Sequence, residues 1–326
     1  MENQEVEEQV AERYCNLMNN AAFSWIFGRE CNKDLLMALL NEFIPDKRIT
    51  DITLIKQCHN SFSKELKSSV FDVSCTTDDG SYIDVEVQVC PQGWFDDRCL
   101  FYSTYLIQSQ IPSGKDDYTL KPVYVVSIDA FARNHSKEND GRTLYSYSLL
   151  EDTTHELMTD SLHFVFVELK KFEKKWQDID NDKERFYFCL KHLHELDELP
   201  QEFTQGIWAK LAQESEFAEM PLDVKKEYIR IMTTERDKQA QLNYARSQAL
   251  SEAFQDIIAE MRLKAPHLNT DEIYYCLLSY IGLNSVQCGY FLHNYSNLRM
   301  MKKRVKCKMP YELSLSIFIA SANSSI

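Results

Sequence analysis

Glycine is scarce in this chain, with 8 residues among 326, about a third of the average usage. None of them forms the G-x-G-x-x-G or G-x-x-x-x-G-K pattern that brings a phosphate onto a helix N-terminus. This absence argues against a nucleotide-binding Rossmann or P-loop enzyme. The 10 cysteines include no C-x-x-C pair, and several lie inside apolar runs, which argues against a zinc site or a disulfide framework.

Long apolar runs are also missing. No stretch of about 18 apolar residues occurs, so we expect no membrane-spanning helix and no membrane partner. The first residues, MENQEVEEQVAER, lack the basic and apolar regions of a signal peptide. We therefore expect a cytoplasmic protein.

Positive charge is deficient overall but concentrated in one place. The net charge of −14 argues against a protein that coats nucleic acid over its whole surface. Residues 296–309 nevertheless contain six basic residues and no acid: Arg299, Lys302, Lys303, Arg304, Lys306 and Lys308. Basic charge is therefore gathered near one end of the chain.

What is present indicates mixed α/β order. With 44% hydrophobic residues, the chain can bury a large core and is expected to hold one large domain and something smaller. Hydrophobic spacing predicts these elements: a helix over 21–43, a strand over 49–57, a hairpin over 68–90, a helix over 94–111, buried strands over 121–131 and 162–169, and helices from 180 onward, the longest over 222–264.

The hairpin is the most informative segment. It reads FDVSC, TTDDG and SYIDVEVQV over residues 71–89. In the second strand, apolar residues at 83, 85, 87 and 89 alternate with Tyr82, Asp84, Glu86 and Gln88, so one face is apolar and the other acidic. The register depends on the turn: a three-residue loop places Asp72 opposite Glu86, whereas a two-residue loop separates them.

In the first register, the Cα atoms of Asp72 and Glu86 lie about 4.5–5.5 Å apart. Two carboxylates that close repel each other unless a proton or a cation lies between them, and hard oxygen ligands suit Mg²⁺. The competing interpretation is that this acidic face is simply the solvated side of an antiparallel sheet.

Eight short pieces, spread over about residues 21–250, occur in the order that a known family shows: FSWIFG at 23–28, NKDLL at 32–36, LLNEF at 39–43, FDVSC at 71–75, IDVEVQV at 83–89, RCLFYSTYL at 98–106, KPVYVVSIDAF at 121–131 and VELKKF at 167–172. On these pieces the chain resembles the recombination-promoting nuclease and transposase family of the PD-(D/E)XK nuclease superfamily. The resemblance implies a restriction-endonuclease-like α/β fold, a mixed sheet flanked by helices.

In such enzymes an acid on one strand and a Glu on its hairpin partner hold a divalent cation. Carried over, Asp72 and Glu86 are the metal ligands for Mg²⁺, with Mn²⁺ as an alternative, and Gln88 is the third catalytic position. Gln88 stands where the superfamily usually has a Lys. Its neutral amide can position a water molecule but supplies no charge. The usual acid and Lys near the first helix appear as Asn20 and Ser24. Glu30 is a further candidate ligand.

The residues at 271–309 resemble a helix-turn-helix of the sigma-factor region-four or response-regulator type. The resemblance places Arg299, Lys302, Lys303 and Arg304 on or beside a recognition helix, where basic residues meet DNA. Arg98, one helical turn from Tyr102, is a candidate contact to the phosphate backbone. The basic cluster also fits a solvated helix face.

These observations give three expected parts: a nuclease-like core over 15–200, a helical extension over 201–265, and a helix-turn-helix-like segment over 266–310. The expected function is metal-dependent DNA endonuclease activity linked to recombination or mobile elements. The alternatives are a DNA-binding regulator on a degenerate nuclease scaffold and a protein-interaction module. DNA is the expected partner. A second copy of the chain, in a homodimer, is a further expected partner, because a double-strand break usually calls for two active sites.

Overall fold

A computed structural model of the chain describes residues 12–45, 47–55, 72–111, 114, 118–133 and 141–264. The chain divides into two compact units, Met1–Glu235 and Arg236–Ile326. The whole sheet described below lies in the first unit. The expected helix-turn-helix at 266–310 and its basic residues Arg299, Lys302, Lys303 and Arg304 lie outside the described residues.

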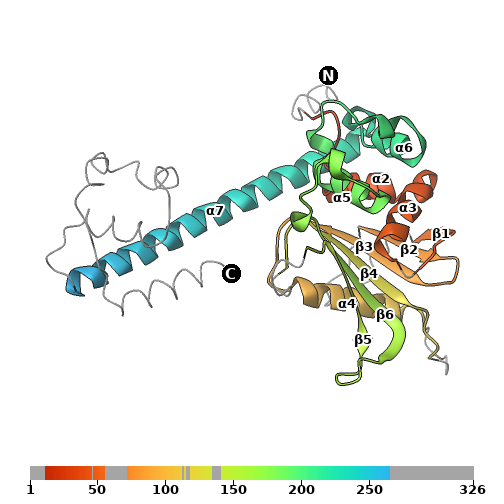
Figure 1. Cartoon of the computed structure of the whole chain (residues 1–326), viewed down its shortest axis with the longest axis horizontal. Coiled ribbons are helices and arrows are strands. Elements are labelled where there is room, and N and C mark those ends of the chain that lie inside the picture. The colour runs from red at the N-terminus through yellow and green to blue at the C-terminus, as the bar shows by residue number, and fades with distance from the viewer. Residues whose placement is uncertain are drawn as a thin grey trace. The chain divides into compact units, whose positions relative to one another are not determined.

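The core of the first unit is one mixed sheet of six strands, in the order β1-β2-β3-β4-β6-β5 (Figure 1). The strands are β1 (Ile52–Ile55), β2 (Val73–Thr77), β3 (Tyr82–Gln88), β4 (Val123–Asp129), β5 (Leu144–Leu150) and β6 (Leu157–Glu168). β3, β4 and β6 run parallel, and the outer pairs are antiparallel. The expected α/β architecture with a mixed sheet is confirmed.

The first unit also contains helices and short 3₁₀ turns, and its last helix, α7, continues into the second unit. The α-helices are α2 (Asn20–Phe27), α3 (Lys33–Phe43), α4 (Phe95–Gln108), α5 (Asp182–His192), α6 (Gly206–Glu214) and α7 (Leu222–Lys264). The 3₁₀ turns are η1 (Glu30–Asn32), η2 (Leu169–Lys171), η3 (Trp176–Asp178), η4 (Leu193–Glu195), η5 (Gln201–Thr204) and η6 (Phe217–Glu219). Within the described ranges, every helix is too short or too polar to span a lipid bilayer.

One face of the sheet is apolar and carries the main core. Ile83, Val85 and Val87 project from β3 on this face and are fully buried with side chains from α2, α3 and α5. The expected single helix over 21–43 is interrupted at Gly28, whose N–H donates to the Ser24 carbonyl at 2.9 Å. A Cβ at residue 28 would lie 2.5 Å from that oxygen, so only glycine fits this close approach.

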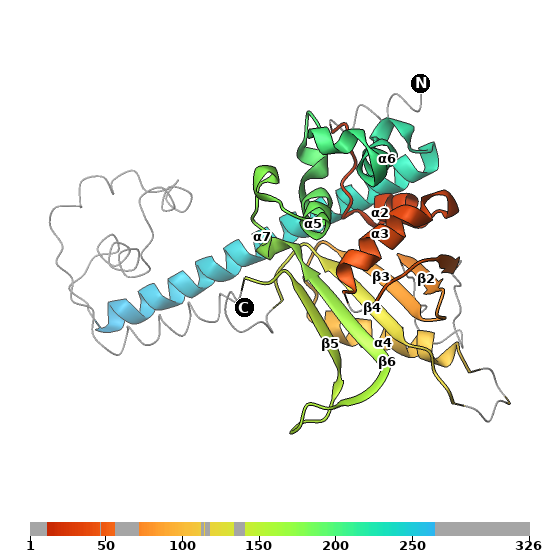
Figure 2. The same ribbon diagram turned by 45° about the vertical axis from the view of Figure 1, so that its right-hand side comes forward.

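The opposite face of the sheet is covered by α4, the helix that sequence periodicity predicted to cross over it (Figure 1). Phe95 and Cys99 of α4 pack on Val125 of β4 and Phe166 of β6. Figure 2 shows α4 behind β4 and β6, away from α2 and α3. The acidic residues of β3 lie on this α4 face, because they alternate with the apolar residues of the core face.

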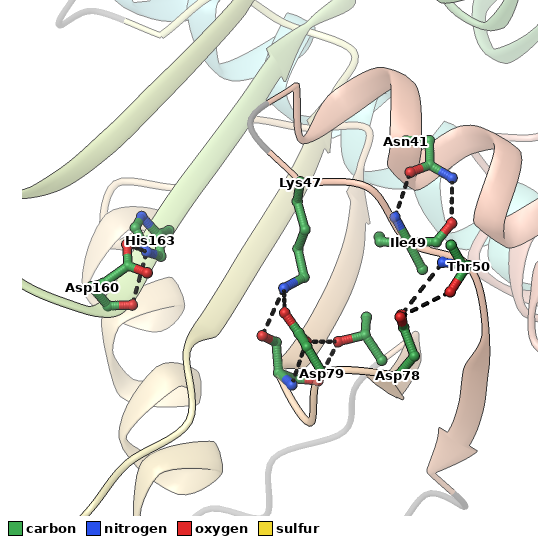
Figure 3. Close-up of polar contacts among 10 residues, drawn as sticks. Asn41, Lys47, Ile49, Thr50, Asp78, Asp79, Asp160 and His163 are labelled. Atoms are coloured by element: carbon green, nitrogen blue, oxygen red, sulfur yellow. Dashed lines mark hydrogen bonds and ion pairs between the residues drawn. The ribbon is translucent and has the colours of Figure 1, made fainter.

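The turn between β2 and β3 fixes the register of the hairpin. It has three residues, because the Thr77 N–H donates to the Ser81 carbonyl at 2.9 Å, and Gly80 adopts a φ of +84°, which favours glycine. Two acids in the turn anchor it to the segment before β1 (Figure 3): Asp78 accepts the Thr50 hydroxyl at 2.8 Å, and Asp79 is bound by Lys47.

Candidate active site

Asp72 and Glu86 lie opposite each other across the β2–β3 hairpin. Val73 pairs with Val85, so the next residue outward on each strand places Asp72 across from Glu86. The Val87 N–H donates to the Oδ2 of Asp72 at 2.9 Å, which holds that carboxylate against β3. The structure therefore brings together the two acids that the three-residue loop predicted would meet.

The acidic face of β3 is buried, not solvated. Glu86 is 4% exposed and Asp84 is 0% exposed, because α4 covers both. The Ser74 hydroxyl donates to Asp84 Oδ1 at 3.1 Å. Glu86 Oε1 and Asp84 Oδ2 are buried without a hydrogen-bond partner among the described residues. The interpretation of this face as the wet side of the sheet is therefore wrong.

This burial changes the proton affinity of the acids. Burial raises the pKa of Glu86 well above its ordinary value, and the neighbouring charges of Asp84 and Asp72 raise it further, against the opposing effect of Arg98. Burial also raises the pKa of Asp84 and of Asp72, although hydrogen bonds from Ser74 and from Val87 respectively oppose it. A bound cation would favour the charged forms that burial disfavours.

Asn20, the first residue of α2, contacts Asp72 directly. Its side-chain amide donates to Asp72 Oδ1 at 2.7 Å. Asn19 caps the same helix end by accepting from the Ala21 N–H at 3.0 Å, which fixes where α2 begins. The position equated with the family's first-helix acid therefore does lie at the hairpin, as a neutral hydrogen-bond donor.

A cavity of about 260 Å³ borders Asp72. Its lining is Ser24, Gly28, Glu30, Leu54, Ile55, Asp72, Val73 and Ser74. Asp72 is partly exposed there, so a ligand can reach it. Glu30, the further candidate ligand, also borders this cavity, but its carboxylate pairs with Lys33 at 2.7 Å.

Gln88 and Arg98 form a second contact beside Glu86. Arg98 of α4 donates to Gln88 Oε1 at 2.8 Å, and Gln88 Nε2 donates to the Cys90 carbonyl at 2.7 Å. Arg98 also approaches Glu86 Oε2 at 3.7 Å. Sequence reasoning expected Arg98 to meet the DNA backbone, whereas the structure places its guanidinium among the motif residues.

Sequence reasoning missed a second pair of acids on the α4 face. Gln88 is aligned with Asp129 of β4, and Asp129 with Glu168 of β6. Asp129 is 0% exposed and Glu168 is 2% exposed. Both acids occupy the last position of an apolar strand, and that placement was the available signal. Arg133 lies 3.6 Å from Asp129, and Lys171 lies 2.9 Å from Glu168, so this pair already has cationic partners.

The donor set at Asp72 and Glu86 fits a hard divalent cation. Carboxylate oxygens are the ligands that Mg²⁺ prefers, and the unsatisfied Oε1 of buried Glu86 is an atom that such an ion would satisfy. Among the described residues, no group of three His, Cys, Asp or Glu side chains forms a complete metal cluster. Two carboxylates suffice for Mg²⁺, which usually keeps several waters and takes the rest of its ligands from substrate phosphate.

The comparisons with known proteins agree with this geometry. A sequence profile described as PD-(D/E)XK nuclease family transposase matches residues 17–245. That match spans the six-stranded sheet, its flanking helices and the first part of α7. No curated protein and no solved structure matched the chain. Because the profile covers more than half of its length, the chain belongs to the PD-(D/E)XK nuclease family transposases.

Proposed function

We propose that this member of the PD-(D/E)XK nuclease family is a metal-dependent DNA endonuclease that hydrolyses phosphodiester bonds. The observation that carries the proposal is the placement of Asp72 opposite Glu86, with a buried, unsatisfied Glu86 oxygen between α4 and the sheet. The family links this chemistry to transposition, so the proposed substrate is the DNA of a mobile or recombining element.

Asp72 and Glu86 would hold the divalent ion, for which Mg²⁺ is the proposed species and Mn²⁺ the alternative. When bound, such an ion lowers the pKa of a water ligand and stabilises negative charge developing on phosphate. The chain's own residues prepare this site. Asn20 and the Val87 N–H each bind one Asp72 oxygen, which fixes the carboxylate's orientation before any ligand arrives.

Access to the site favours the Asp72 side. Glu86 is closed off by α4, whereas Asp72 opens onto the cavity that Ser24 and Glu30 border. A phosphate approaching through this cavity would meet the exposed part of Asp72 first. The buried position of Glu86 excludes bulk water, which strengthens electrostatic interactions within the site.

The proposal also covers domain boundaries, a partner and a segment that lies outside the described residues. We propose that Arg299, Lys302, Lys303 and Arg304, in a helix-turn-helix over 266–310, bind the DNA that the core cleaves. The core over 15–200 and the helical extension over 201–265 remain proposed boundaries. A homodimer would supply two active sites for a double-strand break.

A second candidate function is a DNA-binding regulator that has kept the scaffold without its chemistry. Ser24 stands where a first-helix Lys is expected, and two further residues favour this function as well: Asn20 stands where the family's first-helix acid is expected, and Gln88 where the motif's Lys is expected, so the site has one acid and two cations fewer. Asn20 and Gln88 nevertheless make specific hydrogen bonds at the site, as expected of positions that still serve it.

Plasmid nicking separates the two functions. Purified full-length protein with Mg²⁺ or Mn²⁺ is expected to nick supercoiled plasmid, and EDTA is expected to stop it. Asp72→Asn and Glu86→Gln are expected to lower the rate by more than about 10³-fold, since each removes a proposed metal ligand. Asp160→Asn, a change to an exposed acid near the start of β6, serves as the control. Salt-sensitive DNA binding without nicking would favour the regulator.

A further inference from the structure

The third position of the hairpin motif, Gln88, carries no charge of its own, yet the structure places a cation directly on it. Arg98 lies ten positions further along the chain, in the first turns of α4, and its Nη2 donates to Gln88 Oε1 at 2.8 Å. We infer that Arg98 supplies, through Gln88, the positive charge that this position lacks, and that it orients the Gln88 amide toward the reacting phosphate. The inference rests on the proposed nuclease function and deepens it.

The orientation of Gln88 follows from the chemistry of its neighbours. A guanidinium has only donors, so the Gln88 atom that Arg98 contacts must be the amide oxygen. At the other end, the Cys90 carbonyl is only an acceptor and binds Gln88 Nε2 at 2.7 Å. An amide nitrogen carries two hydrogens. The second one therefore remains to donate to a water or a phosphate oxygen.

Arg98 is held firmly in this place. Its Nη1 donates to Gln92 Oε1 at 3.0 Å, and its guanidinium carbon lies 4.6 Å from the centre of the Phe95 ring and 5.8 Å from that of Tyr102. Its side chain is 24% exposed. A mobile surface arginine that meets phosphate would not be confined in this way, so the pre-placed guanidinium polarises the Gln88 amide continuously.

The position of Arg98 has two opposite electrostatic consequences. Its charge stands 3.7 Å from Glu86 Oε2, so it competes with any cation that Glu86 binds. The same charge, relayed by the Gln88 amide, would stabilise negative charge on a phosphate in the transition state. Removing the Arg98 charge should therefore raise the affinity for the metal ion and lower the cleavage rate. If Arg98 were purely structural, its removal would lower both the metal affinity and the cleavage rate.

The first test is Arg98→Gln, measured in full-length protein by Mn²⁺ titration and by single-turnover plasmid cleavage. We expect Mn²⁺ to bind about 3- to 10-fold more tightly, because a cation next to Glu86 is lost. We expect the cleavage rate at saturating Mn²⁺ to fall about 10²-fold. The control is Arg230→Gln, an exposed arginine paired with Glu227 on α7, which should change neither quantity.

The second test exchanges the charge between the two positions. Gln88→Lys alone places an ammonium beside Arg98 and is expected to lower the thermal midpoint by about 3 °C. The double variant Gln88→Lys/Arg98→Gln keeps one cation and one amide in contact. It is expected to recover both the thermal midpoint and a cleavage rate within about tenfold of the original protein. A double variant as slow as Arg98→Gln would overturn the inference.

Failure of the inference and failure of the proposed function give different results. A protein that binds Mn²⁺ but never nicks DNA contradicts the nuclease proposal. In that case the Mn²⁺ affinity of Arg98→Gln and the thermal recovery of the double variant still decide whether Arg98 places its charge at the Glu86–Gln88 site. If Arg98→Gln weakens Mn²⁺ binding, or if the exchange does not recover stability, then Arg98 does not supply charge to this site.

Discussion

The backbone N–H of Val87 donates to the Oδ2 of Asp72 at 2.9 Å, across the β2–β3 hairpin. This single bond joins the residue before β2 to the strand that carries Glu86. Because it fills one Asp72 oxygen and Asn20 fills part of the other, the Asp72 carboxylate is already fixed in direction. In the proposed metal site, Asp72 is thus the carboxylate that hydrogen bonds hold in place. Glu86 is the carboxylate that is buried with an unsatisfied oxygen.

Burying carboxylates that lack hydrogen-bond partners is costly, so the protein is expected to gain stability when these buried acids are neutralised. Without metal, Glu86→Gln is expected to raise the free energy of unfolding by about 1–2 kcal/mol, because a buried and like-charged carboxylate is removed. The gain should appear in urea unfolding with EDTA present. Asp84→Asn is the matched control on the same face: it should also stabilise the protein but retain cleavage, since Asp84 is not a proposed ligand.

Cleavage that survives in Glu86→Gln, or a loss of stability in both variants, would contradict this assignment. The first result would show that Glu86 does not bind the ion. The second would show that the apparent lack of a partner at Glu86 and Asp84 is filled by ordered water that an amide cannot bind equally well.

Asn20 offers a test in the opposite direction. Asn20→Asp would place a third carboxylate 2.7 Å from Asp72 Oδ1, where a donor now stands. We expect the metal-free protein to lose about 1–2 kcal/mol of stability through like-charge repulsion, and Mn²⁺ to bind about tenfold more tightly. Calorimetric titration and thermal unfolding measure these effects. Asn20→Ala, which removes the donor without adding charge, should weaken Mn²⁺ binding.

The hairpin was predictable from sequence because its turn has a local code. Gly80 after two aspartates indicates a tight turn but fits either a two-residue or a three-residue loop, and the structure has the three-residue loop. The alternation in β3 then separates Glu86 from Val87 by face. Both features depend on residues within a few positions of one another, so the sequence predicted Asp72 opposite Glu86 as one of two registers, and the hydrogen bond from the Thr77 N–H to the Ser81 carbonyl decides between them.

The burial of the acidic face could not be predicted in the same way. Whether α4 covers β3 depends on how Phe95 and Cys99 pack against Val125 and Phe166, residues that are distant in sequence. The same limit hid the contact of Arg98 with Gln88, because the sequence does not show which face of α4 lies on the sheet. β5 was missed because its alternation of tyrosine and serine lacks the continuous apolar run that marked β4 and β6.

The second acid pair predicts a specific dependence of stability on pH. Burial raises the pKa of Asp129 to about 7, Glu168 adds to the rise, and Ser127 and Arg98 oppose it. The folded protein therefore holds a proton that the unfolded chain releases near its ordinary pKa of 3.8. The contribution of Asp129 to the free energy of unfolding is therefore fully present below about pH 4 and is lost as the pH rises from about 4 to about 7.

Asp129→Asn isolates this contribution, because an amide can still accept the Ser127 hydroxyl bond that Asp129 accepts at 2.7 Å. Unfolding free energies measured with EDTA at several pH values should show a slope smaller by up to about 1.4 kcal/mol per pH unit in the variant. A slope equal to that of the original protein would mean that Asp129 is ionised when folded, held by Arg133.

The turn predicts a local effect with little consequence for chemistry. Gly80→Ala forces a side chain into the left-handed region at φ +84°, at a cost of about 1 kcal/mol. The added Cβ would meet only the flexible end of Lys121, at 3.4 Å, so the register should survive. Gly93→Ala, where nothing lies within 4 Å, is the control. Chemical denaturation compares the two variants, and equal stabilities would contradict the prediction.

The outermost strand, β5, has β6 on one side and no strand partner on the other within the described part of the chain (Figure 2). Leu149, Leu150, Leu157 and Met158 are all exposed on this hairpin. A free strand edge bordered by apolar side chains is a template for association between molecules. In concentrated solution the protein should therefore self-associate reversibly. Leu150→Lys should suppress this self-association without altering the acids beneath α4.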